Sequence, residues 1–191
     1  MSEDHSHLIE HKTGSRELFK GHFLHAFRDT VRLPDGKETT REYVVHPGAV
    51  MAIPMLPDGR LVLERQYRYP MGRVMIEFPA GKLDEGEEGL ACVKRELLEE
   101  TGYTASEWAR AGVLHPVISY STEFIEVWFA RGLQLSKPTL DEGEFLEVFT
   151  ATPEEVLAWC RDGTITDSKT LIGALWLQNV LAGTWALQWR S

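Results

Sequence analysis

The chain has 191 residues, of which 43% are hydrophobic and 26% charged, values typical of one globular domain with a substantial core. Its formal net charge of -9 argues against nucleic acid or an anionic membrane surface as the main partner. No apolar run reaches the roughly 18 residues of a membrane helix, and Cys92 and Cys160 lack metal-type spacing, so we expect reduced thiols in a cytoplasmic protein.

The first part of the chain predicts a tail and two hairpins. Residues 1–15 are polar and are expected to form a flexible tail. Residues 16–47 are expected to form a small β-hairpin subdomain, with strands at about 22–33 and 38–45 around a Pro-Asp-Gly turn. Two segments that are apolar on both faces, at 49–56 and 60–66, flank a second Pro-Asp-Gly turn at 57–59 and predict a central hairpin.

The rest of the chain contains both strand and helix patterns. Thr152 and Pro153 are typical of a helix start, and Asp167 or Ser168 begins a last helix that ends near Leu181. An acidic helix is expected at about 88–101, and further strands at about 74–78, 111–117, 124–131 and 144–151. This order indicates a mixed α/β protein rather than an alternating βαβ one.

The acidic segment after Gly81 carries most of the chemical information. With about 100° between successive helix residues, Glu96 and Glu100 project about 40° apart and Glu99 lies about 60° to the other side. Like charges on one helix face repel each other, so a cation is expected there. Mg²⁺ or Mn²⁺, which take oxygen ligands, would suit this face. The alternative, a solvated charged helix, explains neither Gly81 nor Gly102.

The spacing of this segment is that of a known motif. Five residues separate Gly81 from Glu87, and seven more precede the run RELLEETG at 95–102. The pattern resembles the Nudix box, G-x5-E-x7-R-E-U-x-E-E-x-G-U with U aliphatic, and departs from it only at Tyr103, which is aromatic. The resemblance implies a Nudix hydrolase domain at 48–191, an α/β/α sandwich with a mixed central sheet.

In the Nudix family the box forms a loop-helix-loop that binds divalent cations and hydrolyses nucleoside diphosphates linked to another moiety. The resemblance implies Mg²⁺, or Mn²⁺, as the cofactor, with Glu96 and Glu100 as core ligands and with Glu99 and the Ala80 carbonyl adding to them. Arg95 lies four residues before Glu99, and we expect its guanidinium to orient that carboxylate in the catalytic site.

The flanks of the motif resemble the ADP-ribose pyrophosphatase branch of this family, through LERQYR at 63–68, EFPAG at 77–81 and TDSKT at 166–170. The resemblance implies that Arg68 contacts substrate phosphate and that Arg41 lies near the nucleotide. A surface arginine is the alternative for each. Phe23 matches an aromatic residue that stacks on adenine in the branch, and Phe19 and Phe27 are rivals for that role.

Two further segments are expected to face the reacting water. Members of the branch carry a mobile acidic loop whose glutamate is the general base; the resemblance assigns that role to Glu142, and metal or water binding to Glu144. A solvated hairpin loop is the alternative. The loop at 115–123 keeps Pro116 and Glu123 of the branch pattern but lacks its second proline and its glycine. Glu123 is expected to face the terminal ribose or the attacking water.

These patterns together predict an Mg²⁺-dependent pyrophosphatase that cleaves a nucleoside diphosphate sugar, with ADP-ribose giving AMP and ribose 5-phosphate. The alternatives are another nucleotide sugar, such as GDP-mannose, and a non-catalytic Nudix module that senses a nucleotide. The resemblance also implies a homodimer in which the N-terminal hairpin contacts the partner subunit.

Overall fold

The computed structural model describes residues 4–136 and 145–191, and its contacts divide the chain into two compact units. The first unit comprises Met1–Pro47 and Val117–Glu123, and the second comprises Gly48–Pro116 and Phe124–Ser191. Within the described ranges no helix is long and apolar enough to cross a membrane.

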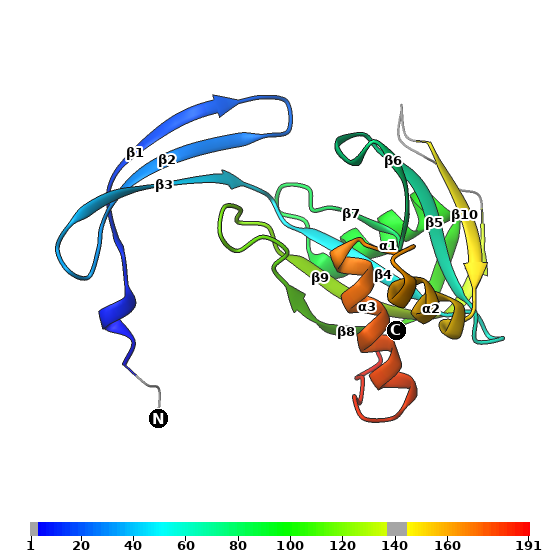
Figure 1. The fold of residues 1–191 in the computed structure, drawn as a ribbon. Coiled ribbons are helices and arrows are strands. Elements are labelled where there is room, and N and C mark those ends of the chain that lie inside the picture. The colour runs from blue at the N-terminus through cyan, green and yellow to red at the C-terminus, as the bar shows by residue number, and fades with distance from the viewer. Residues whose placement is uncertain (1–3, 137–144) are drawn as a thin grey trace. The chain divides into compact units, whose positions relative to one another are not determined.

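The first unit contains a three-stranded antiparallel sheet in the order β1-β2-β3, preceded by a short 3-10 helix, η1 (Figure 1). The bounds are η1 Ser6–Leu8, β1 His11–Lys20, β2 His25–Arg32 and β3 Glu38–Val45. The β2–β3 hairpin agrees with the predicted strands. Its turn contains Gly36 with φ of 86°, a backbone conformation that favours glycine.

The expected flexible tail at residues 1–15 is wrong from His11 onwards, where strand β1 begins and gives the sheet a third strand. Nearly all of its residues are exposed, so its sequence lacks the apolar alternation by which a strand is recognised. The pairing comes instead from the backbone ladder to β2 and from polar contacts such as Ser15 to Asp29, at 2.5 Å. A strand of this kind is invisible to a search for hydrophobic periodicity.

The segment Val117–Glu123 belongs to the first unit, although the sequence places it far from the N-terminal strands. The Val44 amide donates to the Tyr120 carbonyl at 2.9 Å, and the Thr122 amide donates to the Val44 carbonyl at 3.0 Å. These bonds continue the ladder on the edge of β3. The predicted boundary at residue 47 therefore omits one segment of this unit.

The second unit contains two sheets, one of four strands in the order β7-β4-β9-β8 and one of three in the order β10-β5-β6. Strand β4 is parallel to β9 and antiparallel to β7, so the larger sheet is mixed. The first sheet consists of β4 Ala49–Pro54, β7 Ala80–Lys82, β8 Tyr103–Leu114 and β9 Ile125–Leu135. The second consists of β5 Leu61–Arg68, β6 Arg73–Glu77 and β10 Leu146–Ala151, with the 3-10 turn η2 Tyr69–Met71 between β5 and β6.

The predicted central hairpin of 49–56 and 60–66 is wrong. Strands β4 and β5 lie in different sheets, and a single bridge between Met55 and Leu61 joins their ends. Strand β4 is buried along its whole length and β5 over Leu61–Glu64. Each is a central strand with a neighbour on both edges, and its faces are covered by other layers of the fold. The apolar pattern correctly identified two central strands, but a pattern along the chain does not say which neighbour a strand takes.

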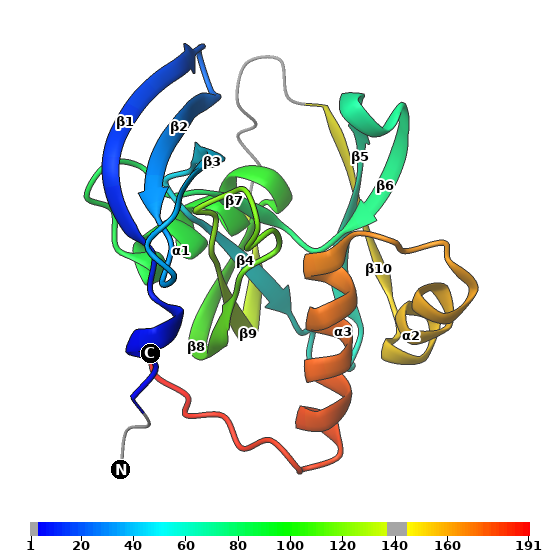
Figure 2. The same cartoon turned by 60° about the vertical axis from the view of Figure 1, so that its left-hand side comes forward.

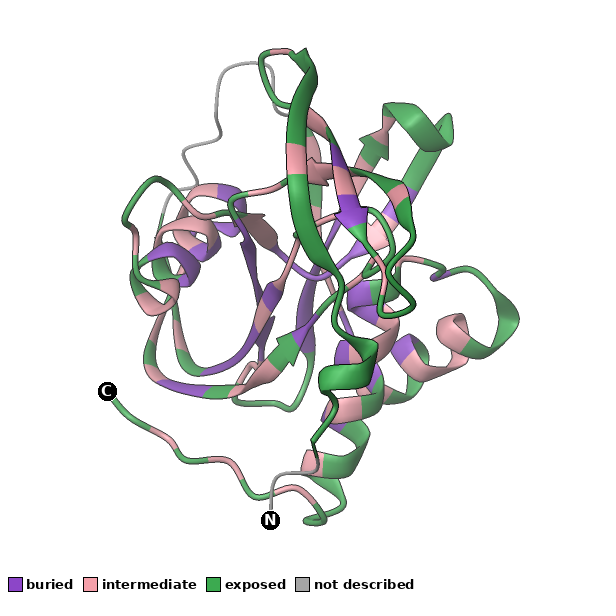
Figure 3. Ribbon diagram, turned by 90° about the vertical axis from the view of Figure 1, so that its left-hand side faces the viewer, coloured by how far each residue is buried: buried purple, intermediate pink, exposed green. Residues whose placement is uncertain are grey.

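The helices cover the larger sheet on both faces. Helices α1 and α3 lie on opposite sides of β4 (Figure 2). Alternate residues of β4 point in opposite directions, so Val50 and Ala52 pack with α1, whereas Met51 and Ile53 pack with α3. The helices are α1 Gly89–Thr101, α2 Pro153–Asp162 and α3 Ser168–Leu181. Figure 3 shows the buried residues concentrated in the strands between the helices. This arrangement confirms the predicted mixed α/β sandwich.

The predicted helix starts are also confirmed. Thr152 and Glu155 form a reciprocal capping box at the start of α2, and the Asp167 carboxylate accepts the Thr170 amide at 3.0 Å at the start of α3. Helix α1 ends at Gly102, whose φ of 73° is the left-handed conformation of a helix C-terminus. These local signals set the starts of α2 and α3 and the end of α1.

Candidate active site

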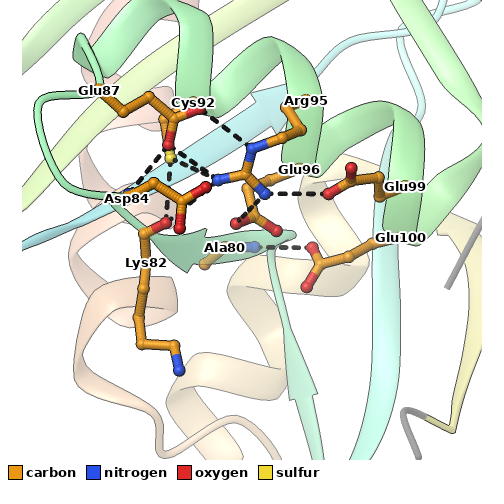
Figure 4. A network of polar contacts seen from close by, with 9 residues as sticks. All are labelled: Ala80, Lys82, Asp84, Glu87, Cys92, Arg95, Glu96, Glu99 and Glu100. Carbon is orange, nitrogen blue, oxygen red and sulfur yellow. Dashed lines mark hydrogen bonds and ion pairs between the residues drawn. The ribbon is translucent and has the colours of Figure 1, made fainter. Parts of the chain in front are cut away.

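The backbone of Ala80 is directed away from its own sheet. The Ala52 amide donates to the Pro79 carbonyl at 2.9 Å, so the next pair along the ladder, Met51 with Ala80, is one without hydrogen bonds between its members. The amide and carbonyl of Ala80 therefore both point to the side away from β4. The amide donates to Oε2 of Glu100 at 3.0 Å, which directs the same edge of the loop towards α1 (Figure 4).

Glycine at position 81 lets α1 approach this loop closely. A Cβ atom there would lie 1.8 Å from the Cδ atom of Glu96 and 2.0 Å from its Oε1 atom, far inside van der Waals contact. The Glu96 carboxylate thus occupies the space that any side chain at this position would fill. The glycine that begins the acidic motif, Gly81, is therefore explained by the close packing of Glu96 against it.

Arg95 ties the acidic side chains together (Figure 4). Its Nη1 atom donates to Glu96 and to Glu99, each at 2.9 Å, while Nε and Nη2 donate to the two oxygens of Glu87 at 3.0 and 2.9 Å. The hydrogen bonds from Arg95 lower the pKa of Glu87 to about 2, and the carboxylates raise the pKa of Arg95. The predicted contact between Arg95 and Glu99 is present, and Glu87 serves to hold the arginine.

The donor set suits a hard divalent cation. Glu96, Glu99, Glu100 and the Ala80 carbonyl offer only oxygen atoms, which Mg²⁺ and Mn²⁺ prefer. Glu100 is 4% exposed and held by the Ala80 amide, while Arg95 holds the other two carboxylates. Within the described ranges no three His, Cys, Asp or Glu side chains already converge as a closed metal cage would. The site is therefore a carboxylate platform whose geometry Arg95 and the loop maintain.

A second charged group lies beside this platform. Arg68, at the end of β5, donates through Nε and Nη2 to the two oxygens of Glu77 at 2.7 and 2.8 Å. The pKa of Arg68 is raised first by this hydrogen bonding and further by the negative charges of Glu77, Glu64 and Glu100. The guanidinium therefore lies within electrostatic reach of a predicted metal ligand, as a phosphate contact requires.

Glu77 is 2% exposed and is bound by two cations. Burial raises its pKa, but the hydrogen bonds from Arg68 and the charge and hydrogen bond of Lys169 outweigh burial and lower it to about 2. Lys169 comes from the first turn of α3 and also donates to Asp167 at 3.0 Å. The sequence-based assignment gave neither Glu77 nor Lys169 a role.

A sequence signal for both residues exists. Lysine in the first turn of a helix is unfavourable next to the positive end of the helix dipole, so Lys169 needs a carboxylate partner. A glutamate between Ile76 and Phe78 in an apolar strand likewise needs a cation. The pair joins residues that are 92 positions apart, however, and no local pattern identifies it.

Three predicted substrate residues belong to the first unit and are described within it. Phe23 is 51% exposed, and its ring meets the His46 ring edge-on at 5.5 Å between centroids. Arg41 donates to both oxygens of Glu10 at 3.0 and 2.6 Å. The Glu123 carboxylate lies 3.9 Å from Nε2 of His46.

The predicted general base Glu142 and its neighbour Glu144 lie outside the described residues. Cys92 is buried in α1, and burial raises the pKa of its thiol.

Two family profiles match the chain. Residues 45–171 match the NUDIX domain, and residues 10–44 match the nucleoside diphosphate sugar hydrolase N-terminal domain. The ADP-ribose pyrophosphatase of Bacillus subtilis is 36% identical over 173 residues, which cover 89% of this chain and 94% of that relative. The methanol dehydrogenase activator of Bacillus methanolicus is 37% identical over 176 residues, which cover 90% of this chain and 94% of that relative.

A solved structure, described as the crystal structure of ADP compounds hydrolase, has the same fold, with a TM-score of 0.83 over 91% of this chain and 95% of that chain at 20% identity. The acidic loop-helix and the two profiles therefore place the protein within one class. The chain belongs to the Nudix hydrolase family, as the spacing of the acidic motif predicted.

Substitution of Gly81 tests the packing of the metal platform. In Gly81→Ala the new methyl group displaces the Glu96 carboxylate, so we expect the affinity for Mn²⁺ to fall about tenfold or more. Calorimetric titration with Mn²⁺ measures this. Gly14→Ala is the control, because its Cβ would sit 3.7 Å from Thr30 at ordinary contact distance. An unchanged affinity in Gly81→Ala would show that Glu96 does not bind the ion.

Acid titration tests the ion pairs of Glu77. The pKa of this group is about 2 against an ordinary value of 4.5, so its stabilisation is complete above about pH 4.5 and is lost as the pH falls towards 2. We expect Glu77→Gln to lower the free energy of unfolding at neutral pH by about 3 kcal/mol, and this difference to shrink across that window. Urea unfolding at a series of pH values measures the difference, and a constant gap would contradict the ion pairs.

Proposed function

We propose that this protein is an Mg²⁺-dependent pyrophosphatase that hydrolyses the diphosphate of a nucleoside diphosphate sugar, with ADP-ribose as the preferred substrate and AMP and ribose 5-phosphate as products. The observation that carries the proposal is the carboxylate platform of α1 beside the Ala80 backbone, with Arg68 within electrostatic reach of Glu100. A diphosphate needs both a metal platform and a fixed cation, and this unit supplies the two together.

In the proposed reaction a bond forms between water oxygen and one phosphorus, and the bond between that phosphorus and the bridging oxygen breaks. A bound divalent ion would polarise the phosphate and stabilise the leaving oxygen. Glu96, Glu99 and Glu100 would hold that ion with the Ala80 carbonyl, and Arg95 would keep the first two carboxylates oriented. Mn²⁺ would serve in place of Mg²⁺ because both take oxygen ligands.

Arg68 would bind a phosphate oxygen. Its Nε and Nη2 atoms are used by Glu77, so Nη1 is the guanidinium nitrogen that this ion pair does not use. By resemblance, Glu142 would remove the proton from the attacking water, with Glu144 binding metal or water and Glu123 facing the terminal ribose or the water. Arg41 and Phe23 would contact the nucleotide, Phe23 by stacking on the base.

The choice of ADP-ribose rests on the relative in Bacillus subtilis and on the matching flanks at 63–68, 77–81 and 166–170. Another nucleotide sugar, such as GDP-mannose, is the alternative substrate, because the loop at 115–123 departs from the branch pattern. A non-catalytic module that senses a nucleotide is the alternative from another class, and the relative named as a dehydrogenase activator keeps that alternative in view. A module that only binds needs no such carboxylate platform.

The first unit is proposed to form the contact between two subunits of a homodimer. Its sheet and the turn after β1 expose apolar side chains that water does not favour, namely Leu18, Phe19, Phe23, Leu24 and Val45. A cytoplasmic location is proposed from the two cysteines, Cys92 and Cys160, which are unbridged.

A panel of nucleotide sugars tests the activity and the metal platform together. We expect hydrolysis of ADP-ribose with Mg²⁺, and a loss of about 10²-fold or more in Glu100→Gln, because the substitution removes a charged oxygen ligand. Release of AMP, followed by chromatography, measures both. Glu85→Gln, an exposed glutamate before α1, is the matched control and should retain full activity.

Preference for another nucleotide sugar in that panel would change the proposed substrate but not the proposed metal ligands. Binding of nucleotides without hydrolysis of any of them would favour the sensing module. Full activity in Glu100→Gln would remove this residue from the metal site.

The general base has a separate test. We expect Glu142→Gln to lower kcat by about 10²-fold or more while leaving metal affinity nearly unchanged, because the residue is proposed to take a proton rather than to hold the ion. Steady-state kinetics and calorimetry with Mn²⁺ measure the two quantities. An unchanged kcat would move the role to Glu144 or Glu123.

A further inference from the structure

Four buried or half-buried charges meet where α3 begins. Lys169 donates to Glu77 and, at 3.0 Å, to Asp167, and Glu77 also accepts both hydrogen bonds from Arg68. The side chain of Glu77 is 3% exposed and that of Lys169 is 11% exposed, whereas that of Arg68 is 40% exposed. Lys169 is therefore enclosed and reaches no substrate directly, while Arg68 keeps an open side.

The position of Lys169 is set by the helix that carries it. Asp167 caps α3 by accepting the amide and the hydroxyl of Thr170 at 3.0 and 2.7 Å. The same hydroxyl accepts the amide of Phe78 at 3.1 Å, which ties the first turn of α3 to the residue after Glu77. The helix also approaches β4 closely at Gly173, where a Cβ would lie 2.7 Å from Cε of Met51. Lys169 is thus held against Glu77 from a rigid element.

The charges explain why such a lysine is needed. The four groups carry two positive and two negative charges, so without Lys169 the cluster has one negative charge in excess and Arg68 is the cation that remains in it. Glu64, fully buried and directly opposite Glu77 in the ladder, adds a further negative group on the same face of the sheet. In a chain with a net charge of -9, a guanidinium fully offset in this way would attract phosphate weakly.

We propose that Lys169 is a positioning residue that balances the charge of Glu77, so that the positive charge of Arg68 is available to the substrate diphosphate. The inference rests on the proposed function, since it assigns Arg68 to phosphate. It goes beyond that proposal by giving a lysine outside the acidic motif a part in substrate affinity. A purely structural role, in which Lys169 only fastens α3 to β6, makes a different prediction.

The test is a double-mutant cycle with kinetic and equilibrium readouts. Lys169→Met removes the balancing charge, and we expect KM for ADP-ribose to rise about tenfold or more with a smaller change in kcat. Glu77→Gln/Lys169→Met removes one charge of each sign and should bring KM back to within about threefold of the unsubstituted chain. Lys169→Arg should also retain affinity, because it keeps the charge.

Calorimetric binding of α,β-methylene ADP-ribose, which carries no cleavable anhydride oxygen, should follow the same order among the variants. Arg161→Met is the control for the loss of one positive charge from the exposed end of α2 and should change neither quantity. Thermal unfolding shows which variants are folded under the assay conditions.

The outcomes separate the two levels of the proposal. A double variant as weak as Lys169→Met, or weaker, would overturn the charge-balancing role and leave Lys169 as a fastening of α3. Unchanged KM and unchanged analogue binding in Lys169→Met would overturn it as well. Absence of hydrolysis by the unsubstituted chain would contradict the proposed function instead, and the analogue would still measure the contribution of Lys169 to diphosphate binding.

Discussion

The fold brings together carboxylates that repel each other, and the site depends on three cations that offset this repulsion. Arg95 spans Glu87, Glu96 and Glu99 on α1 and its preceding loop. Arg68 and Lys169 share the buried Glu77. Each cation makes several bonds, which is the condition under which burying charge is tolerated. Without them the carboxylates would be neutralised by protonation or driven apart, and no platform for a divalent ion would form.

Two backbone constraints set where that platform lies. The register of β7 on β4 turns the amide and carbonyl of Ala80 away from the sheet, and the absence of a side chain at Gly81 lets Glu96 approach the loop. Helix α1 is held against the sheet because Val93 and Leu97 pack on the face of β4 that carries Val50 and Ala52. The acidic face is thereby presented to the loop by the same helix that fills the core.

The helix on the opposite face of β4 carries the second charged network. Met51 and Ile53 pack against α3, and the first turn of that helix supplies Lys169. The two layers of the sandwich therefore each contribute one charged network, and β4 is the element between them. Strand β4 is buried along its whole length because apolar side chains of both layers pack against it.

The sequence by itself determined what depends on near neighbours. Three features follow from residues within one or two helical turns: the period of α1, the contact of Arg95 with Glu99, and the capping of α2 and α3. At this range the spacing of two residues in the sequence fixes the distance between them in a helix. Family membership also followed from spacing, because the acidic motif has many specified positions. The tertiary structure alone decided the partners of β4 and β5, the exposed strand β1, and the ion pair of Lys169 with Glu77 across 92 positions. These depend on which strands pair and on how a buried charge finds its counterion, and neither is encoded in a local pattern.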